Sequence, residues 1–215
     1  MLYLVTGEVR LGKTRWLCDV VGRLARAGVV PYGVLAPGVW RALSDGAGEA
    51  SGFEKLGIDN VLLPQGERVH LARRRDLADV ADLASEDEAA GSASLDWVMD
   101  RVALARVEDH FRALAAMPPD GPCAPGVLVV DELGRLELSR DAGLLSARAL
   151  AEAGPGPRWR SCLVVVRESL LPLALERMRP AWPGVRVVRP GGCDHESLAR
   201  EVVGEIASEL RRWSM

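Results

Sequence analysis

The N-terminal part of the chain changes from an apolar run to a glycine-containing stretch and then to a helical pattern. Residues 2–6 form a short apolar run that Gly7 ends, which is typical of a buried strand. Residues 13–27 then repeat apolar side chains at helical spacing, and Gly28 is a suitable helix stop. The pattern therefore predicts a strand, a glycine loop and a helix in that order.

The next part of the chain consists of short β-type pieces. Between residues 29 and 71, runs such as VVPYGVLAPGVW and NVLLP are interrupted by Gly, Pro, Asp and Asn, which predicts a small antiparallel meander. We assign this insertion to about residues 33–72. Residues 76–94 are acidic and rich in small side chains, which indicates a solvated helix or a mobile loop without chemistry.

The rest of the chain alternates helices and strands. Residues 117–126 contain four prolines and two glycines, which excludes regular structure there. The predicted elements are helix 97–116, strand 127–130, helix 144–153, strand 162–166, helix 168–179, strand 185–188 and helix 195–212. Such alternation predicts an α/β fold with a mostly parallel sheet and helices on both faces, formed by residues 1–215 as one domain.

Residues 7–14, GEVRLGKT, match the phosphate-loop pattern G-x-x-x-x-G-K-[ST] between the first predicted strand and helix. Glycine suits such a loop because a Cβ would block its curl and the close approach of phosphate. The following helix N-terminus adds partial positive charge. Because the chain has only two lysines and two threonines, the pattern arises by chance in roughly one such sequence in a thousand. The loop is therefore predicted to bind the phosphates of a nucleotide.

The predicted contacts to a nucleoside triphosphate such as ATP or GTP come from this loop. Lys13 reaches the β- and γ-phosphates, and the Thr14 hydroxyl ligates Mg²⁺, the expected cofactor. The other predicted contact residues are Gly7, Glu8, Val9, Arg10, Leu11, Gly12 and Arg15.

Two acids, Asp131 and Glu132, end the apolar run 127–130. Open α/β sheets bind ligands at the carboxyl ends of their strands, so we expect this run to neighbour the phosphate-loop strand. In that place Asp131 holds Mg²⁺, directly or through water, and Glu132 orients or deprotonates the attacking water. The structural alternative is that Asp131 caps a strand exit and Glu132 is solvated.

Composition limits the expected partners. The formal net charge is −3, which gives no reason to expect nucleic acid or an anionic membrane as the main partner. The four cysteines show neither a CxxC pair nor zinc spacing, and no run approaches the roughly 18 apolar residues of a membrane span. No leader pattern precedes the first predicted strand, so we expect a cytoplasmic protein.

The segment VLVVDELGRLEL resembles the acidic-motif region of the THEP1-like nucleoside-triphosphatases, which carry an hhDE[IL]GxxEL segment. The matching positions are Asp131, Glu132, Leu133, Gly134, Glu137 and Leu138. GVLAPGVWR at 33–41 is similar to a second family segment, which opens a β-hairpin insertion. The resemblance implies a P-loop NTPase three-layer sandwich with a small antiparallel insertion after the first helix. It also implies Mg²⁺ dependence and hydrolysis of ribonucleoside triphosphates with broad base tolerance.

The chain also departs from the family pattern. Residues 190–194, PGGCD, stand where the family often has an Asn-Arg-Asp-type segment, so the asparagine suited to reading a base edge is missing. In the phosphate loop, Glu8 and Arg10 replace small residues and proline. Base selectivity therefore does not carry over from the family.

Four further candidates each have a structural alternative. Arg135 can act as an internal arginine finger on the γ-phosphate, or it is a surface residue at a helix start. Glu137 can support the metal or favour the first turn of its helix. Arg167 lies on the ligand edge or pairs with a neighbouring acid, and the run 73–75 forms a lid or a solvated surface.

The leading functional hypothesis is a Mg²⁺-dependent nucleoside-triphosphatase. A nucleotide or small-molecule kinase would use the same loop, but it needs an arginine lid and must keep water out. A third hypothesis is a nucleotide-gated binding or delivery protein in cofactor assembly, whose β insertion contacts a partner protein.

Overall fold

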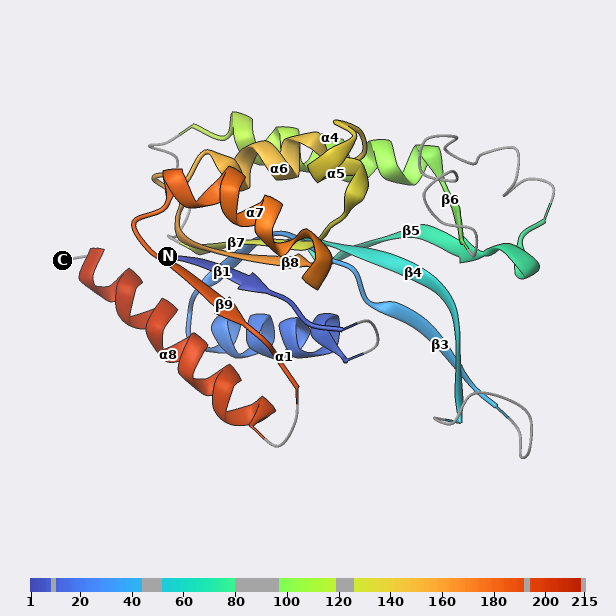
Figure 1. Cartoon of the computed structure of the whole chain (residues 1–215), viewed down its shortest axis with the longest axis horizontal. Coiled ribbons are helices and arrows are strands. Elements are labelled where there is room, and N and C mark those ends of the chain that lie inside the picture. Colours follow the sequence, from blue (N-terminus) through green and yellow to red (C-terminus); the bar gives the residue numbers. More distant parts are fainter. Residues whose placement is uncertain (9–10, 44–51, 80–96, 119–125, 192–193, 214–215) are drawn as a thin grey trace.

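In the part of the chain that the structure describes, nine strands form one mixed sheet (Figure 1). The computed structural model describes residues 1–8, 11–43, 52–79, 97–118, 126–191 and 194–213. Its strands are β1 (Leu2–Val5), β2 (Val30–Leu35), β3 (Gly38–Ala42), β4 (Phe53–Leu63), β5 (Glu67–Arg74), β6 (Trp97–Met99), β7 (Gly126–Leu133), β8 (Trp159–Val166) and β9 (Val185–Val188). Its helices are α1 (Lys13–Arg26), α4 (Arg101–Ala116), α5 (Arg135–Ser139), α6 (Leu145–Glu152), α7 (Leu171–Met178) and α8 (His195–Trp213), with 3₁₀ turns η1 (Arg75–Leu77), η2 (Glu168–Leu170) and η3 (Arg179–Ala181).

Five strands form the parallel part of the sheet. They lie in the order β2-β7-β8-β1-β9, and each neighbouring pair is parallel. The strand that ends in the acid pair, β7, is therefore not a direct neighbour of β1, because β8 lies between them. Our expectation of adjacent strands was wrong by one strand, although both carboxyl ends still lie at the same edge of the sheet.

The antiparallel part extends the sheet beyond β2. β4 pairs with β2, β5 with β4, and β6 with β5, while β3 pairs with β4. The predicted meander is confirmed from β3 onward, but β2 belongs to the parallel part. β2 is buried along almost its whole length, as expected of a strand covered on both faces. In the sequence, Pro31 and Gly33 interrupt the apolar run of β2, and this strand was therefore predicted to belong to the meander.

The helix predicted for residues 97–116 begins later, at Arg101. The preceding segment forms β6, and Asp100 then accepts hydrogen bonds from the backbone N–H groups of Val102 at 2.7 Å and Ala103 at 2.9 Å. This N-cap satisfies donors that the first helical turn leaves unpaired, and it therefore defines the helix start.

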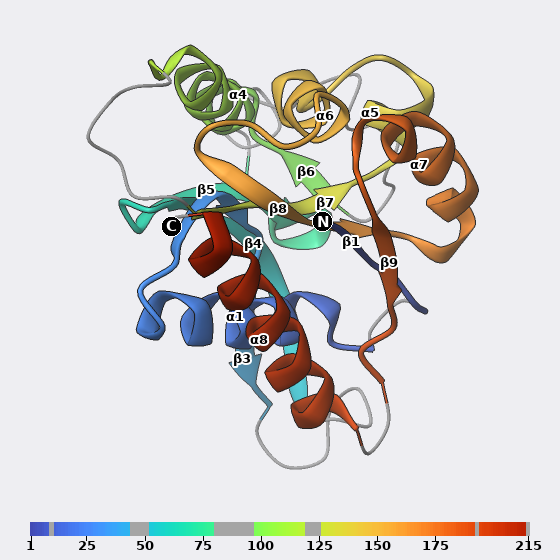
Figure 2. The ribbon, with the colours of Figure 1, turned by 90° about the vertical axis from the view of Figure 1, so that its left-hand side faces the viewer.

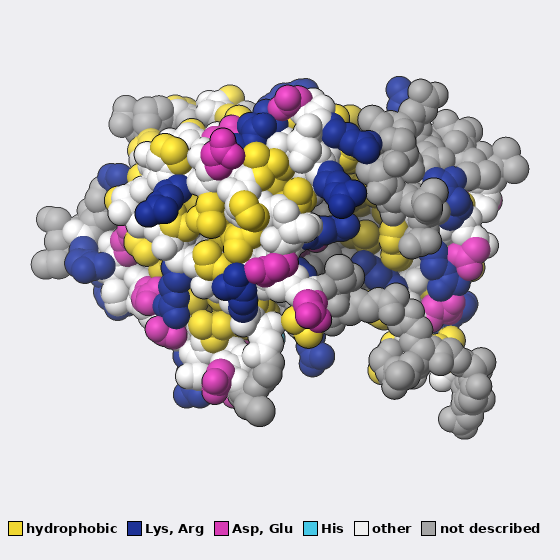
Figure 3. Space-filling view, viewed as in Figure 1, with side chains coloured by type: hydrophobic (Ala, Val, Ile, Leu, Met, Phe, Trp, Pro, Cys, Tyr) yellow, Lys and Arg dark blue, Asp and Glu magenta, His cyan; other side chains and the backbone are white. Residues whose placement is uncertain are grey.

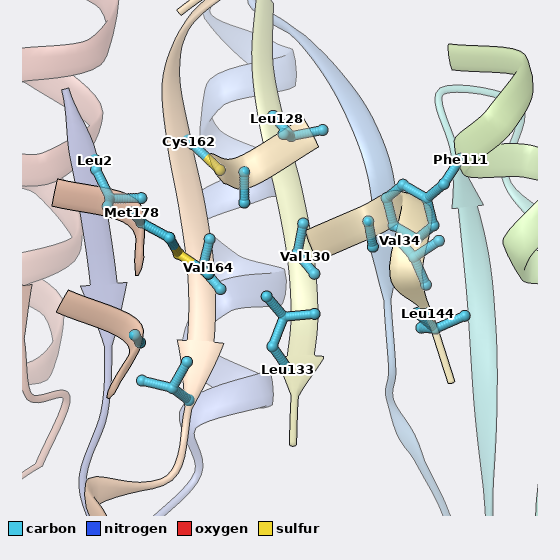
Figure 4. Close-up of a cluster of buried hydrophobic side chains, with 14 of the residues drawn as sticks. Leu2, Val34, Phe111, Leu128, Val130, Leu133, Leu144, Cys162, Val164 and Met178 are labelled. Carbon is cyan, nitrogen blue, oxygen red and sulfur yellow. The ribbon is translucent and has the colours of Figure 1, made fainter. Parts of the chain in front are cut away.

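Helices cover both faces of the sheet, which confirms the predicted fold class. α1 and α8 lie on one face, and α4, α5, α6 and α7 lie on the other (Figures 1 and 2). Leu128 and Val130 of β7 belong to the core under α4, whereas Val127 and Val129 belong to the core over α1. Figure 4 shows the first of these cores, in which Phe111 of α4 packs beside the sheet. Most of the predicted loop segments 76–94 and 117–126 lies outside the described residues.

Charged side chains of both signs are interspersed on the face seen in Figure 3. Exposed ion pairs in the structure include Arg106 with Glu67 at 2.6 Å and Arg112 with Asp109 at 2.8 Å. Such pairs contribute little stability, so the two cores stabilise the fold. None of the helices in the described part of the chain combines the length and the apolar character needed to cross a bilayer.

Gly33 of β2 lies where the parallel and antiparallel parts of the sheet meet. It pairs with Leu63 of β4 and Val129 of β7, and its φ is 121°. A Cβ at this position would lie 2.0 Å from the Val129 carbonyl oxygen. His110 Nε2 also donates to the Gly33 carbonyl oxygen at 3.1 Å. A side chain therefore cannot be placed here unless β7 moves.

We expect Gly33→Ala to lower the free energy of unfolding by about 3 kcal/mol, because it combines a positive φ with overlap of backbone atoms. Gly204→Ala in α8 is the matched control, since nothing lies within 4 Å of its added Cβ. The control should raise the free energy of unfolding by about 0.5–1 kcal/mol. Urea unfolding measures both variants. A Gly33→Ala protein as stable as the wild type would contradict the close approach of β2 and β7.

Candidate functional site

The phosphate-loop sequence connects the carboxyl end of β1 to the first turn of α1. Gly7 has φ 134° and Gly12 has φ 77°, a backbone conformation that favours glycine. Gly12 is the N-cap of α1, and no side chain caps the first N–H groups of this helix. A helix start of this kind can bind an anion. Val9 and Arg10 lie outside the described residues. Three other predicted contact residues are exposed at the loop: Glu8, Leu11 and Arg15.

Lys13 is folded back against its own loop. Its Nζ donates to the carbonyl oxygens of Gly7 at 2.9 Å and Glu8 at 2.7 Å. The residue is only 9% exposed. The ammonium group therefore places a positive charge within the loop, where it is available to a phosphate chain.

Asp131 is buried at the end of β7 beside the start of α1. The Thr14 hydroxyl donates to Asp131 Oδ1 at 3.2 Å, and the backbone N–H of Ala36 donates to Oδ2 at 3.0 Å. Burial raises the pKa of Asp131 to about 6, although the Ala36 hydrogen bond acts in the opposite direction. The structure thus brings together two predicted metal ligands that are far apart in the sequence.

The donor set formed by Thr14 and Asp131 fits Mg²⁺. Hydroxyl and carboxylate oxygens are the hard ligands that Mg²⁺ prefers. Among the described residues, no group of three or more His, Cys, Asp or Glu side chains forms a metal cluster. Mg²⁺ in nucleotide sites usually takes one or two protein ligands and completes its shell with water and substrate phosphates. The arrangement therefore fits an ion shared with a nucleotide.

Glu132 lies at the rim of this site and pairs with Arg167. Arg167 is the first residue after β8, and its Nε donates to Glu132 Oε1 at 2.9 Å. The Glu132 side chain is 34% exposed, so its carboxylate remains open to solvent. From the sequence, Arg167 was expected either to lie at the ligand-binding edge of the sheet or to pair with a neighbouring acid. The structure shows the ion pair.

A second set of contacts lies at the same edge of the sheet. The sequence did not indicate that the residues of this set contact one another. Glu168 accepts hydrogen bonds from the Thr6 hydroxyl at 3.1 Å and from Arg189 Nη2 at 2.7 Å. The Arg189 guanidinium holds the pKa of Glu168 below its ordinary value. Thr6 and Arg189 directly follow β1 and β9, and a search for polar residues at the carboxyl end of each predicted strand would have found them.

The structure gives Glu137 a role in local structure. Its buried carboxylate accepts hydrogen bonds from the backbone N–H groups of Gly134 at 2.8 Å and Leu144 at 3.1 Å. It therefore caps α5 and fixes the segment that leads to α6. Arg135 is exposed at the first position of α5, one residue after Gly134.

The predicted lid run is also held by structural contacts. Arg74, in the middle of this run, pairs with Glu54 at 2.7 Å and with Asp76. These contacts argue against an open arginine lid centred on Arg74.

A strand, glycine loop and helix next to a buried acid at the carboxyl edge of an α/β sheet define the P-loop NTPase class of fold. Two solved structures have a similar overall fold. THEP1 from the hyperthermophile Aquifex aeolicus aligns with a TM-score of 0.61 at 14% identity, over 96% of this chain and 99% of that chain. A human cancer-related nucleoside triphosphatase aligns with a TM-score of 0.60 at 21% identity, over 96% of this chain and 97% of that chain.

No protein-family model and no curated protein matches this sequence. The structural likeness shows a THEP1-like nucleoside-triphosphatase fold, which confirms the fold that the resemblance implied.

We expect Glu137→Ala to lower the free energy of unfolding by about 2–4 kcal/mol, because it leaves two backbone N–H groups without an acceptor. Glu196→Ala, at a side chain that is 69% exposed, is the control and should change stability by less than about 0.5 kcal/mol. Denaturant unfolding compares the two variants. A Glu137→Ala protein of wild-type stability would show that the capping contacts do not stabilise the fold.

Proposed function

We propose that the protein is a Mg²⁺-dependent nucleoside-triphosphatase that releases inorganic phosphate and a nucleoside diphosphate. The observation that carries this proposal is the hydrogen bond between Thr14 of the phosphate loop and the buried Asp131 of β7. P-loop hydrolases use these two parts together, one for the phosphates and one for the metal. The human structural neighbour, which is named a nucleoside triphosphatase, supports the same chemistry.

The proposed nucleotide site is formed by residues 7–15. Backbone N–H groups of the loop and the start of α1 surround the phosphates, and Lys13 contributes a positive charge. Exchange of its present carbonyl partners for phosphate oxygens would let the Lys13 ammonium bind the β- and γ-phosphates. Thr14 and Asp131 would hold Mg²⁺, which neutralises charge on those phosphates when it is bound.

Glu132 is the proposed base. Its solvent-accessible carboxylate lies one residue beyond Asp131, where it can orient a water molecule and accept its proton. The water oxygen bonds to the γ-phosphorus, and the bond from that phosphorus to the bridging oxygen breaks, so the electron pair stays on the diphosphate. Arg135, exposed two residues past Leu133, is the proposed further contact to the transferring phosphoryl group.

The competing hypotheses receive less support from the contacts. A kinase lid would require free guanidinium groups, whereas Arg74 is held by two carboxylates. A partner surface on the β insertion stays a prediction, and the exposed Trp40 of β3 and Phe53 of β4 are the side chains that it would use. Hydrolysis is therefore the function that the geometry supports best.

We expect Glu132→Gln to bind nucleotide within about threefold of the wild-type affinity and to lose at least about 100-fold in kcat, because only the proton acceptor is removed. Lys13→Ala should instead weaken binding by more than about 100-fold. Calorimetric binding and phosphate release measure the two effects. Wild-type turnover by Glu132→Gln would show that Glu132 is not the base.

Measuring phosphate release from ATP, GTP, CTP and UTP tests both the proposed hydrolytic activity and the selectivity for the nucleotide base. Because the proposed contacts are to phosphates, we expect the four kcat/KM values to lie within about tenfold of one another and to require Mg²⁺. Thr14→Ala should raise the Mg²⁺ concentration that gives half-maximal activity, whereas Thr14→Ser keeps the hydroxyl and should resemble the wild type. Release that is independent of Mg²⁺, or no release at all, would contradict the proposed function.

A further inference from the structure

The ion pair between Arg167 and Glu132 joins the carboxyl ends of two neighbouring strands. Arg167 follows β8, Glu132 lies at the end of β7, and the contact runs from Arg167 Nε to Glu132 Oε1 at 2.9 Å. β7 and β8 lose their regular register between Val130 and Leu133, at the position of the two acids. Regular sheet pairing therefore does not hold the backbone at Glu132, and the orientation of its side chain depends on such contacts.

Arg167 is itself held in place by its neighbours in the chain. Its backbone carbonyl accepts a hydrogen bond from Leu170 N at 2.9 Å, which closes the turn after β8. The carboxylate of the next residue, Glu168, accepts hydrogen bonds from Thr6, before the phosphate loop, and from Arg189, after β9. Arg167 and Glu168 therefore connect the acid pair of β7 to the strand that carries the phosphate loop.

A surface ion pair by itself would mean little. Arg106 and Glu67 form an even shorter pair, at 2.6 Å, between α4 and β5, and exposed pairs of this kind contribute almost nothing to stability. The difference lies in the function proposed for Glu132, since a base must be held within a narrow range of positions relative to water and phosphorus. A guanidinium fixed to one carboxylate oxygen restricts the rotamers of that carboxylate. Within the described residues, no hydrogen bond is made to the other oxygen, Oε2.

We propose that Arg167 is a positioning residue that orients the Glu132 carboxylate toward the attacking water. This inference rests on the proposed nucleoside-triphosphatase function. Arg167 acts through Glu132 and does not bind the nucleotide, so its removal should change the rate of the chemical step and leave nucleotide affinity unchanged.

The test is Arg167→Gln, measured in single-turnover phosphate release with ATP and Mg²⁺ together with nucleotide binding. We expect kcat to fall about 10- to 100-fold, because a misplaced base slows the chemical step. The dissociation constant of the nucleotide should stay within about twofold of the wild-type value. Arg167→Lys retains the positive charge and a donor, and it should recover several-fold of the lost rate. Arg106→Gln removes the comparable surface pair and should leave both quantities within about twofold of the wild type.

A double-mutant cycle separates positioning from direct contact with the substrate. In a Glu132→Gln protein the base is already absent, so adding Arg167→Gln should change the residual rate by less than about twofold. An equal loss in both backgrounds, or weaker nucleotide binding by Arg167→Gln, would overturn the positioning role. An unchanged kcat for Arg167→Gln would overturn it as well.

The same measurements distinguish this inference from the function on which it rests. If the wild-type protein releases no phosphate with Mg²⁺ and any of the four nucleotides, the proposed function fails and the role of Arg167 fails with it. If the wild type turns over and Arg167→Gln does so equally fast, only the positioning role is overturned.

Discussion

The buried carboxylate of Asp131 is the interaction on which the arrangement of the site depends. Burial disfavours its charged form, so the carboxylate needs donors, and it receives them from the Thr14 hydroxyl and the Ala36 N–H. These donors come from α1 and from the turn between β2 and β3. The carboxylate therefore ties α1, β2 and β7 together at one point. The phosphate loop is thereby held beside β7, even though β8 separates the two strands.

The acidic segment that begins at the end of β7 places three carboxylates in three different environments. Asp131 is buried and faces α1, Glu132 is partly exposed at the rim and pairs with Arg167, and Glu137 is buried in the cap of α5. The side chain of Glu137 is used by the backbone around it, so it cannot also serve the metal. Of the acids that carry the resemblance, Glu137 therefore has a role in local folding, which the contacts show and the sequence did not.

The sequence predicted local features well and long-range partners poorly. Apolar spacing and glycine positions located most of the strands and helices, because these signals lie within a few residues of each other. They did not show that β2 pairs with β7, since Pro31 and Gly33 interrupt its apolar run. The phosphate loop was visible as a motif. The contacts of Glu132 and Glu168 were not, because their partners Arg167 and Arg189 are defined only by the order of strands in the sheet.

That order of strands explains how polar residues from separate parts of this chain meet at one edge of the sheet. Arg167, after β8, contacts Glu132 at the end of β7, and Glu168 contacts Thr6 after β1 and Arg189 after β9. A hydrophobic pattern that sets the lengths of these strands therefore also places their carboxyl ends together. Much of the rest of the chain fills the two cores, where apolar side chains of suitable volume can replace one another. The same fold can therefore persist at 14% and 21% identity.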